Sequence, residues 1–367
     1  MLADLKELVT CESFSADHAA VARSAEVVGA LGARLLGTGP ERIVIDGVTH
    51  LRWAFGTPRV LLLGHHDTVW PIGSLEERPW SVANGIARGP GVLDMKAGLV
   101  QMFHALASLS SLDGVCVLVT GDEEVGSPTA RKLIEEAARA CAAALVLEAA
   151  ADEEGALKTA RKGTSRYEVV VHGRAAHAGQ EPHQGVNAAV EAAHQVLAVV
   201  GIGAAMGAVG AAHPVLGVST VTPTLLSAGS ARNTVPAQAR VSVDVRVPTV
   251  DAQEWTDELM RELTVQSPGA RLEIRGGAER PPMQPESSAD LFALASRLAA
   301  ELGQDPLRGI AVGGASDGNW TAAAGCPTLD GLGAVGGGAH ADTEHVQIAQ
   351  LIPRGLLLAH LIDRAQR

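Results

Sequence analysis

VCVLVTGDEEVGS, residues 115–127, joins a short apolar run to three consecutive carboxylates. The β-branched residues of 115–120 predict a buried strand, and Ser127 followed by Pro128 predicts the start of a helix. Residues 122–124 therefore lie in a turn at the carboxyl end of a strand, where open α/β sheets place their chemistry. Such a turn could simply be solvated. One neighbour cannot neutralise three adjacent carboxylates, however, so we expect a cationic partner.

Strands and helices alternate on both sides of this stretch. The alternation predicts an α/β fold with a mostly parallel central sheet. The predicted helices cover residues 2–36, 95–109 and 127–140, and the predicted strands cover 41–48, 50–55, 59–63, 115–120 and 145–148.

The pattern changes near Arg161, where a second domain is predicted to begin. Its elements follow the order β-α-β-β-α-β, which is the ferredoxin-like order. We expect a catalytic domain made of residues 1–160 and 277–367, with residues 161–276 inserted as a lid. A single large domain with a long excursion is the alternative. The predicted insert contains strands 164–172, 215–221, 238–247 and 272–275 and helices 186–200 and 251–263; helix 289–302 and a long last helix from about residue 343 complete the chain.

Composition excludes several classes of function. The formal net charge of −12 over 367 residues argues against binding to nucleic acid or to an anionic membrane. The N-terminus lacks a signal-peptide-like apolar stretch, and no run approaches a membrane span. The four cysteines are scattered without CxxC spacing, which favours a reduced, cytoplasmic protein.

Possible metal ligands occur in several separate loops, each where a predicted strand ends or a helix begins. A single histidine is more often a core or surface residue, but several at one sheet edge favour a site. The candidates are His65, His66 and Asp67 in GHHDTV, Asp94 in GPGVLD, Glu123 and Glu124 in GDEE, Glu148, and His340 and His345 in GGGAHADTEH.

The order HxD, DMK, DEE, E, HAG and H resembles the M20 family of zinc peptidases and deacylases. The segments GPGVLDMKAG and GGASDGN are most similar to its glutamate carboxypeptidase branch. The resemblance implies a catalytic α/β domain, a ferredoxin-like lid used for homodimerisation, and two Zn²⁺ ions that Co²⁺ or Mn²⁺ could replace. Two such ions can share one water and hold it as hydroxide, the implied nucleophile.

The resemblance also implies a role for each candidate. Asp94 would bridge both metals; His65 and Glu148 would complete one site, and Glu124 and His340 the other. Asp67 would accept a hydrogen bond from the His65 ring and fix its tautomer. Glu123 would be the general base. Spacing alone does not decide between Glu123 and Glu124.

Three other residues are weaker candidates. His66 is not expected to be a ligand. His345 rivals His340, which we favour because it follows a glycine run that lets backbone approach a metal. Lys96 is expected to be structural.

Substrate residues are expected partly in the lid. By the resemblance, His177 in HAG would stabilise the oxyanion, in its own chain or across a dimer. Arg246 would clamp a substrate carboxylate, and Asn233 would line the same cleft. Gly314, in the GGASDGN turn before a helix, would offer backbone N–H groups to a carboxylate.

The leading hypothesis is a dizinc hydrolase that removes a C-terminal amino acid, with an acidic one favoured, from a peptide or N-acyl conjugate. An N-acyl amino acid deacylase or a dipeptidase on the same machinery is the nearest alternative. A metal-binding or ligand-binding protein without catalysis is the alternative of another class, but it would have no chemical need for Glu123.

Overall fold

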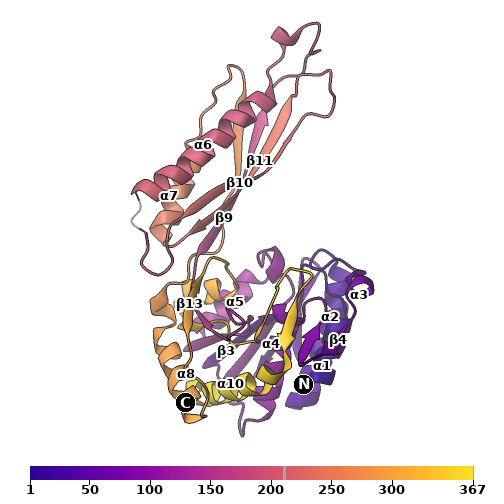
Figure 1. The fold of residues 1–367 in the computed structure, drawn as a ribbon, viewed down its shortest axis with the longest axis vertical. Helices are drawn as coiled ribbons and strands as arrows, with labels where there is room; N and C mark the ends of the chain where they lie inside the picture. The colour runs from indigo at the N-terminus through magenta and orange to yellow at the C-terminus, as the bar shows by residue number, and fades with distance from the viewer. Residues whose placement is uncertain (210–211, 367) are drawn as a thin grey trace. The chain divides into compact units, whose positions relative to one another are not determined.

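The computed structural model describes residues 1–209 and 212–366, and the chain divides into two compact units (Figure 1). Unit 1 comprises Met1–Ala160, Met283–Val312 and Ser316–Arg367, and unit 2 comprises Arg161–Pro282 and Gly313–Ala315. Unit 2 thus interrupts the sequence of unit 1, and each unit has its own hydrophobic core.

A six-stranded sheet forms the centre of unit 1, in the order β1-β2-β6-β3-β7-β14. The four strands from β6 to β14 run parallel, whereas β2 is antiparallel to both β1 and β6. The predicted α/β fold with a mostly parallel sheet is therefore confirmed. The bounds are β1 (Glu41–Ile45), β2 (Val48–Ala54), β3 (Val60–His65), β6 (Val115–Thr120), β7 (Ala143–Val146) and β14 (Thr328–Leu329).

Helices cover both faces of this sheet. Successive strand residues point to opposite faces, and in β3 and β6 apolar residues are buried on both faces. Leu62 packs into a core shared with α1, α2, α4, α8 and α10, whereas Leu61 and Leu63 pack against α5 and α9. This burial on both sides explains the unbroken apolar sequence of β3 and β6. The bounds are α1 (Leu2–Thr10), α2 (His18–Leu36), α3 (Ser74–Glu77), α4 (Ala97–Ala107), α5 (Arg131–Arg139), α8 (Ala289–Glu301), α9 (Gly318–Ala323) and α10 (Leu351–Ala365).

A small antiparallel sheet, in the order β15-β16-β5-β4, brings together two loops that are far apart in sequence. Its strand β16 pairs with β5, with His345 opposite Arg88. The loop that follows β5 therefore lies beside the loop that precedes β16. The bounds are β4 (Ser81–Ala83), β5 (Ile86–Arg88), β15 (Gly336–Gly337) and β16 (His345–Gln347); β8 (Leu157–Arg161) pairs separately with β13 (Gly309–Val312).

Unit 2 has the predicted β-α-β-β-α-β order and an antiparallel sheet in the order β10-β11-β9-β12. Helices α6 and α7 lie along one face of this sheet (Figure 1). Alternate residues of β11, Val241, Val243 and Val245, enter that core, while Ser242 and Asp244 between them are only half-buried. The bounds are β9 (Gly163–His172), α6 (Ala188–Val209), β10 (Thr220–Ala228), β11 (Gln238–Val247), α7 (Val250–Arg261) and β12 (Arg271–Ala278).

By length and composition, α6 is apolar enough to cross a membrane, with a mean hydropathy of 1.5 over Ala188–Gly207. The expectation that no run approaches a membrane span is therefore wrong for this helix, the one that qualifies within the described residues. The same helix carries the buried Glu191, whose carboxylate accepts hydrogen bonds from the backbone N–H groups of Gln266 and Ser267. These contacts bind α6 to its own domain.

Two predicted helix starts are wrong. The single helix expected over residues 2–36 is two helices, because Asp17 caps α2 by accepting from the N–H groups of Ala19 and Ala20. Ser127 does not cap α5, which begins at Arg131. Ser127 instead has a φ of 58°, and its hydroxyl donates to Asp317.

Two further predicted elements are displaced along the chain. The strand expected at 215–221 is β10, which starts at Thr220 because Gly217, with a φ of 70°, closes a turn onto His213. The last helix starts at Leu351, not near Thr343, because His345–Gln347 form β16 and Ile348–Gln350 form a 3₁₀ turn.

Candidate metal centre

The candidate ligands gather where the parallel strands of unit 1 end. His65 is the last residue of β3, opposite Thr120 at the end of β6, and Glu123 and Glu124 occupy the following turn. Glu148 lies two residues beyond β7. The small sheet brings in the other two candidates, Asp94 from the loop after β5 and His340 from the loop before β16.

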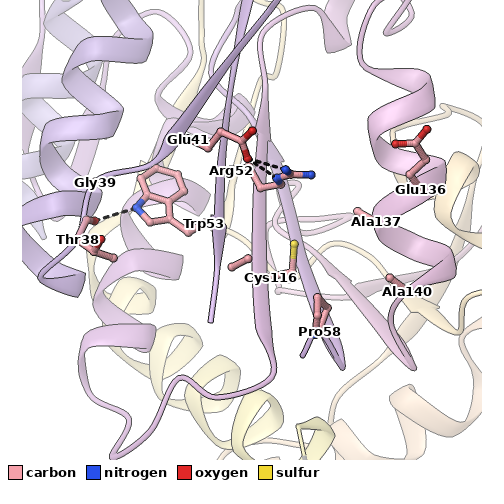
Figure 2. A pocket seen from close by; sticks show the side chains of 11 residues that line it. Thr38, Gly39, Glu41, Arg52, Trp53, Pro58, Cys116, Glu136, Ala137 and Ala140 are labelled. Carbon is pink, nitrogen blue, oxygen red and sulfur yellow. Dashed lines mark hydrogen bonds and ion pairs between the residues drawn. The ribbon is translucent and has the colours of Figure 1, made fainter. Parts of the chain in front are cut away.

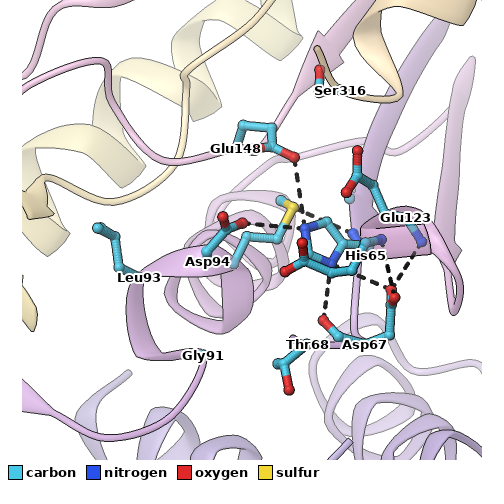
Figure 3. A network of polar contacts seen from close by, with 12 residues as sticks. His65, Asp67, Thr68, Gly91, Leu93, Asp94, Glu123, Glu148 and Ser316 are labelled. Carbon is cyan, nitrogen blue, oxygen red and sulfur yellow. Dashed lines mark hydrogen bonds and ion pairs between the residues drawn. The ribbon is translucent and has the colours of Figure 1, made fainter. Parts of the chain in front are cut away.

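Asp94 lies between two histidines. Its Oδ1 is 3.2 Å from the Nε2 atom of His65, and its Oδ2 is 3.2 Å from the Nε2 atom of His340. Glu148 approaches the first histidine, with Oε1 3.6 Å from His65 Nε2 (Figure 3). Glu124 approaches the second, with Oε2 3.2 Å from His340 Nε2. The five predicted ligands thus form two clusters joined by one carboxylate.

The donor atoms suit divalent metal ions. Single ligand atoms of His65, Asp94 and Glu124 lie within 4.8 Å of one another, as do those of His65, Glu123 and Glu148. Within the described residues, Glu124 Oε1 is buried without a hydrogen-bond partner. Imidazole and carboxylate groups are ligands that Zn²⁺ takes at catalytic sites. These residues therefore fit a metal centre.

The groups of the cluster shift one another's pKa values. Burial, together with the nearby Asp94 charge, raises the pKa of Glu124 to about 7. Hydrogen bonds to Asp94 and Glu124 raise the pKa of His340 to about 10. Burial opposes ionisation of Asp94, but hydrogen bonds from His340 and His65 hold its pKa well below the ordinary value. A bound cation would favour the ionised forms of Asp94 and Glu124, as a protonated His340 does.

Asp67 is fully buried and organises the turn that carries the two glutamates. Its carboxylate accepts from the hydroxyl of Ser15 at 2.7 Å and from the backbone N–H groups of Glu123 and Glu124 at 3.2 Å each. The His65 Nδ1 atom lies 3.0 Å from the Asp67 backbone carbonyl oxygen and 3.4 Å from the carboxylate. These acceptors place the ring proton on Nδ1, which leaves Nε2 available as a ligand atom. The ring nitrogen is thus closer to the Asp67 backbone carbonyl oxygen than to the carboxylate that the sequence analysis predicted as its acceptor.

The three weaker candidates have other partners. His66 is buried with Nε2 3.0 Å from the Thr49 carbonyl oxygen. His345 has Nδ1 3.0 Å from the Thr343 carbonyl oxygen and pairs with Arg88 in the small sheet. Lys96 is buried and donates to the Cys11 carbonyl oxygen at 2.8 Å, while burial lowers its pKa to about 8.

The four predicted substrate residues all belong to unit 2. His177 is exposed, and its Nδ1 accepts from two backbone N–H groups of its own loop, those of residues 179 and 180. The adjacent Ala178 N–H donates to the Asn233 carbonyl oxygen, which brings these two loops together. Arg246 forms a bidentate pair with Asp244, at 2.8 and 2.9 Å. The Gly314 carbonyl oxygen accepts from Arg161 Nη1 at 2.9 Å.

Two charged residues near the ligands escaped the sequence analysis. Lys158 Nζ lies 3.8 Å from Glu148 Oε2, although no motif marks it. Glu344 is buried and contacts the backbone of the Asp94 loop. Its position four residues after His340 in the GGGAHADTEH segment was the one available signal.

A separate pocket of about 440 Å³ lies at the opposite end of the central sheet (Figure 2). Cys116 lines it near the start of β6, whereas the metal candidates follow the end of that strand. Within its lining, Arg52 pairs with Glu41 and the Trp53 indole donates to the Thr38 carbonyl oxygen. Nothing in this pocket resembles the cluster at the strand ends.

Residues 61–364 match the model of peptidase family M20/M25/M40, and the chain belongs to this family. It is 29% identical to carboxypeptidase G2 of Pseudomonas sp. (strain RS-16), over 97% of this chain and 86% of that protein. It is 27% identical to succinyl-diaminopimelate desuccinylase of Rhodopseudomonas palustris (strain HaA2), over 87% of each. The crystal structure of an M20 family metallo-carboxypeptidase from Sulfolobus solfataricus superposes with a TM-score of 0.78 at 16% identity, covering 100% of this chain and 99% of that one. The protein is thus a hydrolase of the M20 type, as the motif order predicted.

Proposed function

We propose that this chain is a two-metal hydrolase that removes a C-terminal amino acid, with an acidic residue favoured, from a peptide or an N-acyl conjugate. The observation that carries the proposal is Asp94, with one carboxylate oxygen 3.2 Å from each of two histidines. His65 with Glu148 would hold one ion, and His340 with Glu124 the other. We propose Zn²⁺, which Co²⁺ or Mn²⁺ could replace.

When bound, the ions would supply Lewis-acid chemistry by polarising the amide carbonyl and acidifying a water molecule. Glu123 would take a proton from the attacking water and deliver it to the leaving nitrogen. Its side chain is buried, and its backbone N–H is held by Asp67, so the carboxylate starts from a fixed turn. The 3.2 Å contact between Glu124 and His340 supports Glu124 as the ligand of the pair.

Unit 2 would bind the substrate. Arg246 would hold the substrate carboxylate with the guanidinium N–H groups that Asp244 leaves available, because a planar guanidinium can serve two carboxylates. His177 would donate to the developing oxyanion, from its own chain or from a partner chain. Asn233 and Gly314 would also contact the substrate.

We propose that unit 2 also forms a homodimer. Strand β10 is an edge strand, with Leu225 71% exposed and Leu226 57% exposed. On α6, Leu197 is 69% exposed and Val200 is 52% exposed. An exposed apolar edge of this kind is a template for pairing with another chain, and a second copy carries the same edge. Size-exclusion chromatography with light scattering should give twice the chain mass, and Leu225→Lys should reduce it; a monomeric wild type would contradict the proposal.

The resemblance to a desuccinylase supports a second candidate function, N-acyl amino acid deacylation on the same machinery. Peptides and acyl amino acids are therefore the partners we propose, and neither nucleic acid nor membrane is expected given the net charge of −12. All four cysteines are free, which supports the proposed cytoplasmic location. The match to a family of hydrolases favours catalysis over a binding protein.

Zinc-loaded protein tested against folyl-glutamate, N-acetyl amino acids and dipeptides would separate these candidates. We expect the fastest hydrolysis with the glutamate conjugate, about two zinc equivalents per chain, and loss of activity on chelation. Preference for N-acetyl amino acids would favour the deacylase. A stoichiometry of one that added zinc does not change would refute the two-metal site.

A further inference from the structure

The carboxylate of Glu344 is buried and accepts four hydrogen bonds. Its Oε1 accepts from the backbone N–H groups of Leu93 at 2.8 Å and Asp94 at 3.1 Å. Its Oε2 accepts from the backbone N–H of Gly91 at 2.9 Å and from the indole N–H of Trp70 at 2.8 Å. The two oxygens thus take two donors each, and all but one belong to the main chain.

These contacts join three of the loops that carry candidate ligands. Glu344 itself immediately precedes β16, and Arg88 at the end of β5 donates to the carbonyl oxygen of Thr343 at 2.9 Å. The paired strands therefore carry Glu344 to the loop that contains Asp94. Trp70 brings in the third loop, which follows His65 at the end of β3.

Glu344 also shares a tight turn with His340. The Ala341 N–H donates to the Gly338 carbonyl oxygen, and the Glu344 N–H donates to the Ala341 carbonyl oxygen, both at 2.9 Å. His340 has a φ of 61° within this turn, a conformation that non-glycine residues adopt only when their surroundings hold them there. One carboxylate therefore ties the backbone of Asp94 to the turn that presents His340.

We propose that Glu344 is a positioning residue of the metal centre: without contacting a metal, it sets the separation between Asp94 and His340. The inference rests on the proposed function, because Asp94 must serve both ions. Ligand geometry of this kind must hold to within about 0.5 Å, which requires fixed backbone as well as correct side chains.

A purely structural role is the competing explanation. The N–H groups that donate to Glu344 belong to the start of the irregular turn Val92–Lys96, in which Asp94 and Met95 have non-helical φ/ψ angles, and to Gly91 before it. Satisfying these buried donors would by itself stabilise the turn. In that case, losing Glu344 would lower stability and leave metal affinity unchanged. The two explanations therefore differ in what happens to the metal.

Glu344→Gln tests this difference, because glutamine keeps the size but turns an amide N–H₂ group toward N–H donors. We expect the metal-free variant to keep its far-UV circular dichroism. In zinc titration calorimetry, the weaker of the two sites should lose about 10- to 100-fold in affinity, the usual effect of removing a residue that supports a ligand. At saturating zinc, we expect kcat to fall more than KM rises.

Two further variants keep the test decisive. Glu191→Gln is a matched control, since that buried carboxylate of unit 2 also accepts backbone N–H groups, and it should leave zinc affinity unchanged. If Glu344→Gln does not fold, Trp70→Phe removes one donor and should weaken the same zinc site by less than tenfold. Wild-type zinc affinity in a folded Glu344→Gln, or in Trp70→Phe, would overturn the inference. Wild-type protein that binds fewer than two zinc ions would instead refute the proposed two-metal site, and the inference with it.

Discussion

Replacing Gly98 by alanine should destabilise unit 1, although alanine is the better helix former. Gly98 lies in α4, where an added Cβ would be 2.1 Å from the backbone oxygen of Leu147. Gly333 approaches the same oxygen, at 2.2 Å from its own added Cβ, so the segment that precedes Glu148 passes between two glycines. The Leu147 backbone therefore cannot move away from α4 without approaching Gly333.

The size of the effect follows from two opposing contributions. Relieving the clash requires a backbone shift of about 1 Å, and overpacking of this kind costs about 1–3 kcal/mol. We take the upper value because the obstacle is backbone held on both sides. The higher helix propensity of alanine offsets about 1 kcal/mol of this cost. The net loss of about 2 kcal/mol corresponds to a fall of about 4–8 °C in the melting temperature of a unit of this size.

Thermal unfolding of the metal-free protein, followed by circular dichroism, would measure this change. Gly29→Ala is the control, because Gly29 lies in α2 of the same unit and its added Cβ would meet only the Pro40 ring, at 3.4 Å from Cγ and 3.8 Å from Cδ. That variant should gain about 0.5–1 kcal/mol from helix propensity. A Gly98→Ala protein that melts at or above the wild-type temperature would show that the described packing of α4 against Leu147 is wrong.

Other variants test the site and its surroundings. Glu123→Gln should retain both metals and lose at least about 10²-fold in turnover, whereas Glu124→Ala should lose metal; the opposite pattern would reverse their roles. His177→Ala should lower kcat by about 10²–10³ with zinc content unchanged, and Arg246→Ala should mainly raise KM for substrates with a carboxylate. If His177 acts across a dimer, mixing His177→Ala with Glu123→Ala chains should restore activity; mixed chains that exchange subunits and stay inactive would exclude this. Burial raises the pKa of the Cys141 thiol to about 12, so at pH 8 it should resist iodoacetamide until the protein unfolds; rapid alkylation of the native protein would contradict this.

Sequence patterns could predict the central sheet and the ligand loops because both depend on local features. Continuous apolar runs mark strands buried on both faces, and short charged motifs follow them directly, so the loops that carry His65 and Glu124 could be picked out from the sequence; the choice of Glu124 over Glu123 as a ligand came from the family resemblance. Glu344 could not be assigned a role in this way, because its partners are mainly backbone N–H groups, which leave no pattern in the sequence. The start of β10 was predicted too early because apolar residues flank Gly217 on both sides and resemble a continuous strand, whereas Gly217 forms a turn.

Two carboxylates outside the candidate ligand set, those of Asp67 and Glu344, hold the loops of the cluster in place through backbone N–H groups. Asp94, Glu124 and Glu148 converge in a buried region, and their mutual repulsion favours opening the loops. Asp67 holds the turn of the two glutamates through backbone N–H groups, and Glu344 holds the loop of Asp94 in the same way. Bonds to backbone do not depend on the ligand side chains or on the metal. The fold can therefore maintain this concentration of negative charge, and cations of the proposed metal centre would stabilise the folded chain, because the unfolded chain offers no such site.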